Sequence, residues 1–192
     1  MKRSIVLLAT IVLGFCLLGT QAAFADLEGT ATSHVFATVS PNMTVSAQAN
    51  VDAGTVQTGD FSALCTFTIE ANTQQVSIYA ESTDLWKGDI LVDPTDPDYT
   101  PPIPLNLSVP IAVGLDLASP LGGADPELVW TGTAGDINGF PSQLTNPLGL
   151  ESAQVGHFSQ DMDLEVTWNQ ADPEKPQGEY SGYVKLYAMV II

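Results

Sequence analysis

The sequence predicts an all-β protein built from many short strands. Apolar and polar residues alternate with a period of two along almost the whole of residues 26–192, as they do in half-buried strands. No window shows an apolar stripe at helical spacing. Hydrophobic residues make up 45% of the chain and charged residues only 14%, so the composition is that of a protein with a core and not of a disordered tail.

The chain is strongly acidic. It holds 22 Asp and Glu residues against 5 Lys and Arg residues, which gives a formal net charge of -17. Such a surface repels phosphate groups, so we do not expect nucleic acid or an anionic membrane surface as a partner. At 192 residues the chain forms one domain, or at most two small ones.

The beginning of the chain, residues 1–25, is predicted to be an export signal peptide. Lys2 and Arg3 precede the apolar run 5–18, and the small-x-small pattern that ends at Ala25 predicts cleavage there. The apolar run is shorter than the roughly 20 residues that a membrane-spanning helix needs, and no later segment is long or apolar enough. We therefore expect an exported protein whose mature chain has no membrane span.

The amino-terminal segment 26–50 is predicted to hold the first strands. Residues 35–39 form one of them, and a second strand follows Pro41. In this second strand, small polar residues separate the apolar positions, as expected for a strand with one buried face. The apolar positions are Met43, Val45, Ala47, Ala49 and Val51.

A hairpin is predicted next, at the start of a domain that spans residues 51–192. After a turn region at 54–59 comes a strand that contains Cys65, and residues 72–75 turn the chain into a strand at 76–80. Cys65 alternates with Phe61, Ala63, Phe67 and Ile69. We therefore expect it to be a buried core residue, and not a reactive thiol or an intermolecular bridge. Because it is the only cysteine of the predicted mature chain, no internal disulfide can form.

Residues 84–150 are rich in proline and glycine, and we expect long connections between short edge strands in this region. Proline cannot donate a hydrogen bond to a strand ladder, so a cluster such as 93–102 cannot be a central strand. Short apolar runs at 105–113 and 128–130 are the expected edge strands.

Regular strands return near the carboxyl terminus. Met162, Leu164, Val166 and Trp168 share one face of a predicted strand. A loop follows at 169–177, and the last strand is predicted to cover 180–192. Val184, Leu186, Ala188 and Val190 lie on one face of that strand, and Tyr183, Tyr187, Met189 and Ile191 lie on the other.

A strand that is apolar on both faces must be covered on both sides. We therefore expect the last strand to lie in the core. The many short strands and the turns between them favour an immunoglobulin-like Greek-key sandwich over a closed barrel.

No motif for catalysis or for a cofactor stands out, and we do not expect an enzyme. His34 and His157 stand alone in the sequence, so they predict no catalytic triad. The many acidic residues supply pairs of carboxylates, but a pair alone does not indicate a glycosidase. The sequence has no phosphate-binding loop and no dinucleotide fingerprint, so we expect no nucleotide cofactor.

Two oxygen-rich loops are candidate calcium sites. One carries Asp93, Asp96 and Asp98, and the other carries Asp136 and Asn138. Neither matches the spacing of an EF-hand loop. Asp-Pro repeats form solvated turns more often than metal sites, so we expect no metal here, although calcium at the first loop stays an alternative.

Exposed aromatic residues could stack against sugars. Trp86 and Tyr99 are flanked by polar residues and prolines, and we expect them to be exposed. Trp168 is in phase with core residues of its strand, and we expect it to be buried.

The tail PQGEYSGYVKL, residues 176–186, resembles the closing strand of secreted pilin subunits. Colonisation-factor fimbriae and spore coat U type domains show a Gly-x-Tyr-x-x-x-Val-x-Leu or Val pattern that leads into their last strand. Gly178, Tyr180, Ser181, Gly182, Val184 and Leu186 occupy those places here. The alternating segment 42–47 is similar to the strand that such subunits donate to a neighbour.

The resemblance implies a structural subunit of a surface fibre, adhesive or not, whose sandwich a donated strand completes. It also implies like subunits, a periplasmic chaperone and an outer-membrane usher as partners, with passage through the periplasm to the cell surface. The implied donor residues are Met43, Val45, Ala47, Ala49 and Val51, or alternatively Val35, Ala37 and Val39. The implied carboxyl-terminal assembly strand contains Gly178, Tyr180, Gly182, Val184, Leu186, Ala188 and Val190.

Two other functions stay open from the sequence. One is a self-contained secreted module that binds a surface glycan or a protein partner, in which the amino-terminal strand folds into its own sheet. The other is a secreted hydrolase, which would need two carboxylates in a pocket made by residues 84–150.

Overall fold

The computed structural model of the protein describes residues 32–123 and 126–191, and the predicted signal peptide lies outside this part of the chain. The chain divides into an amino-terminal unit that ends at Thr38 and a domain, Val39–Ile192, and each is considered by itself.

The residues before position 43 form no strand where the structure describes them, from residue 32 onward. In the amino-terminal unit, the ring centroids of His34 and Phe36 lie 5.9 Å apart. The strand predicted at 35–39 is therefore wrong for the isolated chain. Side-chain alternation alone does not make a strand, because the backbone groups also need a hydrogen-bonding partner.

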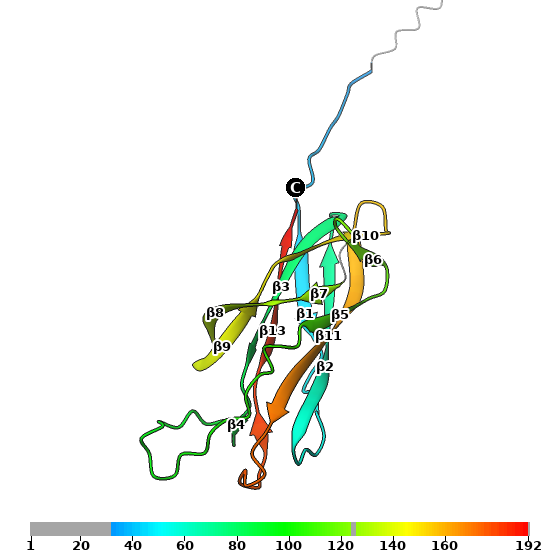
Figure 1. Cartoon of the computed structure of the whole chain (residues 1–192). Coiled ribbons are helices and arrows are strands. Elements are labelled where there is room, and N and C mark those ends of the chain that lie inside the picture. Colours follow the sequence, from blue (N-terminus) through cyan, green and yellow to red (C-terminus); the bar gives the residue numbers. More distant parts are fainter. Residues whose placement is uncertain (1–31, 124–125, 192) are drawn as a thin grey trace, which may run out of the picture. The chain divides into compact units, whose positions relative to one another are not determined.

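The predicted all-β fold is confirmed. The described residues form 13 strands, and they include no helix that could cross a membrane. Two antiparallel sheets share one hydrophobic core, an arrangement consistent with a β-sandwich (Figure 1). The immunoglobulin-like Greek-key pattern of connections stays a prediction.

One sheet, called sheet A, has the strand order β1-β2-β11-β5-β7. Its strands are β1 (Met43–Ala47), β2 (Gly59–Ala71), β11 (Phe158–Gln170), β5 (Ile111–Leu115) and β7 (Glu127–Leu128). The long strands β2 and β11 pair over their whole length, without a register shift. This pair is the centre of sheet A, and β1 is the strand at one of its edges.

The second sheet, sheet B, is organised around β3 (Gln75–Thr83). The strand β13 (Val184–Val190) pairs with one side of β3, and β10 and β9 share the other side. The remaining strands are β6 (Ala118–Pro120), β10 (Leu148–Ser152), β9 (Phe140–Thr145) and β8 (Trp130–Ile137). A separate two-stranded sheet pairs β4 (Trp86–Lys87) with β12 (Tyr180–Ser181).

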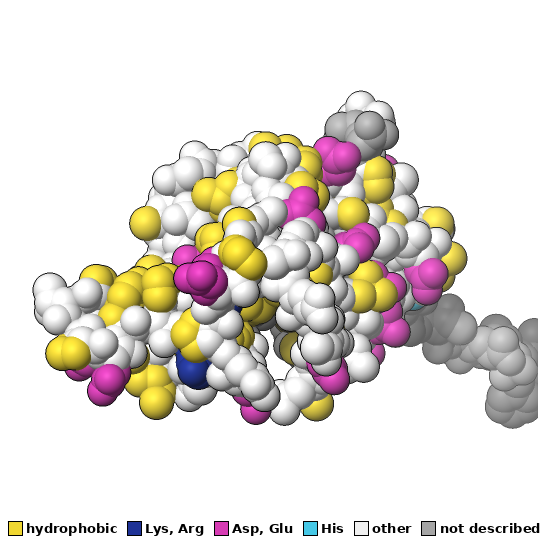
Figure 2. Space-filling view, turned by 60° about the horizontal axis from the view of Figure 1, so that its bottom comes forward, with side chains coloured by type: hydrophobic (Ala, Val, Ile, Leu, Met, Phe, Trp, Pro, Cys, Tyr) yellow, Lys and Arg dark blue, Asp and Glu magenta, His cyan; other side chains and the backbone are white. Residues whose placement is uncertain are grey.

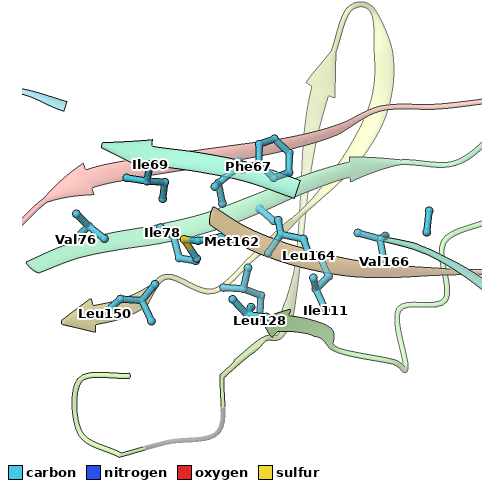
Figure 3. Packing of buried hydrophobic residues seen from close by; sticks show 14 of the residues in the cluster. Phe67, Ile69, Val76, Ile78, Ile111, Leu128, Leu150, Met162, Leu164 and Val166 are labelled. Atoms are coloured by element: carbon cyan, nitrogen blue, oxygen red, sulfur yellow. The ribbon is translucent and has the colours of Figure 1, made fainter. Parts of the chain in front are cut away.

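The core lies between the two sheets and is made of the alternating apolar residues of their facing sides (Figure 3). Sheet A contributes Ile69, Met162 and Leu164, and sheet B contributes Val76 and Ile78, all fully buried. Burying such side chains contributes roughly 1.5–3 kcal/mol each before the entropy cost of folding is subtracted. The inward faces predicted for 61–69, 76–80, 162–168 and 184–190 are thus the faces that meet in the core.

The middle of the chain differs from its prediction. The strands β5, β9 and β10 each have a neighbour on both sides, so they are interior strands and not edge strands. The prolines between positions 94 and 110 all lie outside the strands. The strands β5 and β10 contain no proline, and Pro141 of β9 lies beyond the residues of that strand that pair with β3.

The predicted last strand is divided into β12 and β13. Gly182 lies at the division, where an added Cβ atom would come within 2.6 Å of the Asp84 carbonyl oxygen. The close approach of two backbones at this point requires a glycine. Ile192 lies outside the described residues.

Candidate functional site

The strand β13 is an edge strand of sheet B. Thr83 N donates to Tyr183 O at 3.0 Å, and Ile191 N donates to Gln75 O at 3.1 Å, so odd-numbered residues direct their backbone groups toward β3. The even-numbered residues, from Val184 to Val190, direct theirs toward the opposite side. In the described residues no strand pairs with that side. A row of free N–H and C=O groups therefore runs along β13.

The inward face of this strand is only partly covered. Val184, Ala188 and Val190 are half-buried, although they lie opposite Ser82, Ile78 and Val76, which are fully buried. Only Leu186 of the inward-facing set is buried. The core is therefore incomplete along the β13 edge.

The outward face of β13 is closed by a stacked pair of tyrosines. The rings of Tyr79 and Tyr187 lie 4.4 Å apart and are nearly parallel, at 5°. The ammonium group of Lys185 lies over the Tyr187 ring, 4.5 Å from its centroid. Both faces of the Tyr187 ring are thus occupied, so this ring cannot offer a face to a sugar.

A buried carboxylate fixes the same tyrosine. The Tyr187 hydroxyl donates to Glu81 Oε2 at 2.7 Å, and the Ser142 hydroxyl donates to Glu81 Oε1. Glu81 is only 3% exposed. A carboxylate buried this deeply needs such hydrogen bonds, and they tie the outward side of β13 to β3 and β9.

The predicted donor residues fall into two groups. Met43, Val45 and Ala47 lie on β1, opposite Ala71, Ile69 and Phe67 of the same chain. Residues directly opposite in an antiparallel pair share a face, so these three side chains are on the core side of sheet A. Ala49 and Val51 lie beyond the end of β1.

The core-side side chains of β1 are also only partly buried. Met43 packs against the core, but Val45 is 38% exposed and Ala47 is exposed. β1 lies close to β13, so the free edges of the two sheets are neighbours on one side of the domain (Figure 1). The predicted donor strand and the predicted assembly strand are brought together at this place.

The Gly-Glu-Tyr-Ser-Gly-Tyr motif before β13 holds a loop in place. Tyr183 donates from its hydroxyl to Asp89 at 2.8 Å, and Ser181 donates to the same carboxylate at 3.3 Å. The Tyr180 hydroxyl donates to the Pro176 carbonyl oxygen at 2.9 Å. Asp89 was not singled out from the sequence, because nothing local marks a residue whose partners are more than ninety positions away.

The expectation of an exposed aromatic platform is wrong for Trp86. This side chain is only 8% exposed and packs against Phe140, whose ring also contacts Tyr183. The polar neighbours of Trp86 in the sequence give no sign of this contact, which forms only when β4 and β9 come together in the fold. Tyr99 is half-buried. The prediction for Trp168 is confirmed, since it is buried and donates from its ring nitrogen to Thr83 O.

The two candidate calcium loops use their oxygens for local turns. Asp93 accepts hydrogen bonds from the backbone and the hydroxyl of Thr95, and Asp96 accepts one from the backbone of Asp98. Asp136 accepts one from Gly139 N in a tight turn. In the part of the chain that the structure describes, no three His, Cys, Asp or Glu side chains are grouped to hold a metal ion. Acidic side chains are spread over the face in Figure 2, where basic ones are sparse.

Cys65 packs against the core from the inward face of β2, as expected, and is half-buried. Burial raises the pKa of its thiol above the ordinary value, which favours the unreactive protonated form. His157 lies at the surface, with its ring Nδ1 3.3 Å from the Val155 carbonyl oxygen.

The fold and this site define an all-β domain, consistent with a sandwich, that has a free and partly uncovered apolar edge. No protein-family model, curated protein or solved structure matches the chain.

Proposed function

We propose that the protein is a structural subunit of a surface fibre that assembles by β-strand complementation. A strand from one copy adds to the free edge of β13 in the next copy. The observation that carries this proposal is the combination of unpaired backbone groups and half-buried apolar side chains along β13. A donated strand satisfies both, because it pairs with the backbone and covers Val184, Ala188 and Val190.

The segment 33–41 is the donor that fits best. Met43, Val45 and Ala47 are engaged with β2 of their own chain, so they are not free to leave without opening sheet A. The preceding residues Val35, Ala37 and Val39 show the same alternation. Residues 32–42 form no strand in the single chain. This agrees with a donor segment, because an isolated strand gains its backbone hydrogen bonds only when it binds to the edge of another copy.

Donation in one direction gives a chain of copies. Each copy donates one segment and accepts another through a different surface, so the contact is heterologous and a filament results. Export by a signal peptide, a periplasmic chaperone that covers β13 before assembly, and an outer-membrane usher belong to this proposal.

Size-exclusion chromatography with light scattering tests the proposal. Val35→Asp with Val39→Asp should abolish polymers, because both charges would lie against the half-buried apolar side chains of β13. Phe36→Asp with Thr38→Asp is the matched control on the opposite face of the donor, and it should leave polymers intact. A protein that is monomeric at all concentrations without any substitution would overturn the proposal.

The acceptor edge is tested by Ala188→Pro. The backbone N–H of Ala188 faces away from β3, so proline there keeps the pairing with β3 and removes a donor for the incoming strand. We expect folded monomers that do not polymerise. Met189→Pro is the control, because its N–H faces β3 and its loss should unfold the edge.

One observation favours a second function, a self-contained binding module. β1 pairs with β2 of its own chain, as such a module requires. A stable monomer that keeps its fold when Val35 and Val39 are replaced and that binds a glycan or protein partner would support this alternative.

A further inference from the structure

The strand β1 covers only half of its neighbour. It pairs with residues 67–71 of β2, and the last bond of this ladder runs from Gln48 N to Thr66 O at 2.9 Å. Backbone groups two residues apart point to the same side of a strand. Ser62 and Leu64 therefore direct their N–H and C=O groups toward the same side as Thr66. In the described residues they have no backbone partner there.

The segment that follows β1 carries the side chains needed to cover this half. The register places Met43 opposite Ala71, Val45 opposite Ile69 and Ala47 opposite Phe67. Continued without a shift, it places Ala49 opposite Cys65, Val51 opposite Ala63 and Ala53 opposite Phe61. All six pairs are apolar and lie on the core side.

A local kink keeps the backbone of this segment from pairing with β2, although the Ala53 side chain packs against the core. Asp52 accepts a hydrogen bond from Gly54 N at 2.8 Å, which closes a short turn. Gly54 has φ +82°, a left-handed conformation that is incompatible with a strand. Val51 is left 40% exposed.

The geometry points to a second arrangement of this segment: we propose that residues 49–55 close onto β2 in the existing register and extend β1 to residue 55. The chain then turns through a three-residue loop at 56–58 into β2, which begins at Gly59. The closed arrangement pairs the free backbone groups of Ser62 and Leu64 and places Val51 opposite Ala63. The outer side of β1 then forms the edge of sheet A along the whole of β2, and this arrangement does not depend on the proposed function, which concerns the edge of sheet B.

A cysteine pair reports the closed arrangement. Residues 51 and 63 would form a non-hydrogen-bonded pair, with Cα atoms about 4.5 Å apart, which is close enough for a disulfide. In a Cys65→Ala background, Val51→Cys with Ala63→Cys should cross-link within one chain under mild oxidation. Val51→Cys with Leu64→Cys is the control, because residue 64 lies on the other face. Equal rates for the two pairs, or no cross-link in either, would overturn the proposal.

The kink supplies a second arm of the test. Gly54→Thr destabilises the left-handed conformation of residue 54, and therefore the open arrangement relative to the closed one. The rate of the 51–63 cross-link should rise roughly tenfold as a result. An added Cβ atom at Gly54 meets nothing within 4 Å, so only the backbone is affected. Gly156→Thr is the matched control, since Gly156 also has a positive φ, +78°, and open space around it. An unchanged rate in Gly54→Thr, or the same increase in Gly156→Thr, would show that the segment does not close in this way.

Discussion

The strands β11 and β13 carry the same pattern of alternating apolar residues, but they differ in how deeply those residues are buried. Met162, Leu164 and Val166 of β11 are fully buried, and the strand lies between β2 and β5. Val184 and Ala188 of β13 are half-buried, and the strand has β3 alone as a neighbour. The alternation of apolar and polar residues decides which face of a strand points inward, whereas the number of flanking strands decides how much of its apolar surface is buried.

The largest expected effect comes from substituting equivalent positions of the two strands. Leu164→Ala should lower the free energy of unfolding by about 2–5 kcal/mol, because it leaves a cavity in a fully packed region. Val184→Ala should lower it by no more than about 1 kcal/mol, because its side chain is half-exposed already. Urea unfolding of both variants measures the difference, and equal losses would contradict the comparison.

The next effect concerns how β13 is held to its sheet. Glu81→Ala removes the acceptor for both Ser142 and Tyr187, and should lower the free energy of unfolding by about 1–3 kcal/mol. Tyr187→Phe removes one of these bonds and should cost about 1 kcal/mol. Thermal unfolding of the two variants tests this order. If Tyr187→Phe cost as much as Glu81→Ala, the carboxylate would not be the centre of the network.

A smaller, pH-dependent effect is expected at the end of β3. Burial raises the pKa of Asp84 above its ordinary value, although a hydrogen bond from Leu105 N acts in the other direction. A raised pKa in the folded state means that the stabilisation linked to this group is present below the unfolded pKa and is lost as the pH rises through the folded value. Asp84→Asn keeps the acceptor for Leu105 without the charge.

The variant Asp84→Asn should therefore lose less stability than the unsubstituted protein when the pH is raised from 3 to 7, roughly the range in which a carboxylate with a raised pKa titrates. Urea unfolding across this range measures the difference. A constant difference between the two proteins at every pH would show that Asp84 does not titrate differently in the folded state.

The smallest effect reports on the uncovered half of β2. The raised pKa of Cys65 and its partial burial should make its alkylation by iodoacetamide slower than that of a free thiol at pH 8, and faster as the pH rises. Gly54→Thr should slow the reaction further, because closure of residues 49–55 covers this thiol. A rate equal to that of free cysteine would indicate that the edge opens more widely than the structure shows.

Much of the fold could be predicted because it depends on local alternation. The inward positions of Cys65 and Trp168 follow from their phase with neighbouring apolar residues, and both pack as expected. The burial of Trp86 could not be predicted, since its partner Phe140 is distant in the sequence. The same holds for Glu81 and Asp89, whose roles come from hydrogen bonds to residues far along the chain.

The sequence by itself determined the all-β class, the faces of the long strands and the acidic surface, because these follow from side-chain alternation and charge within short windows. Only the tertiary structure decided which strand pairs with which. It placed β1 on β2 of its own chain, made β5, β9 and β10 interior strands, and left β13 at an edge. The physical reason is that strand pairing joins backbone groups from distant parts of the chain, and the side-chain pattern of a strand does not specify its partner.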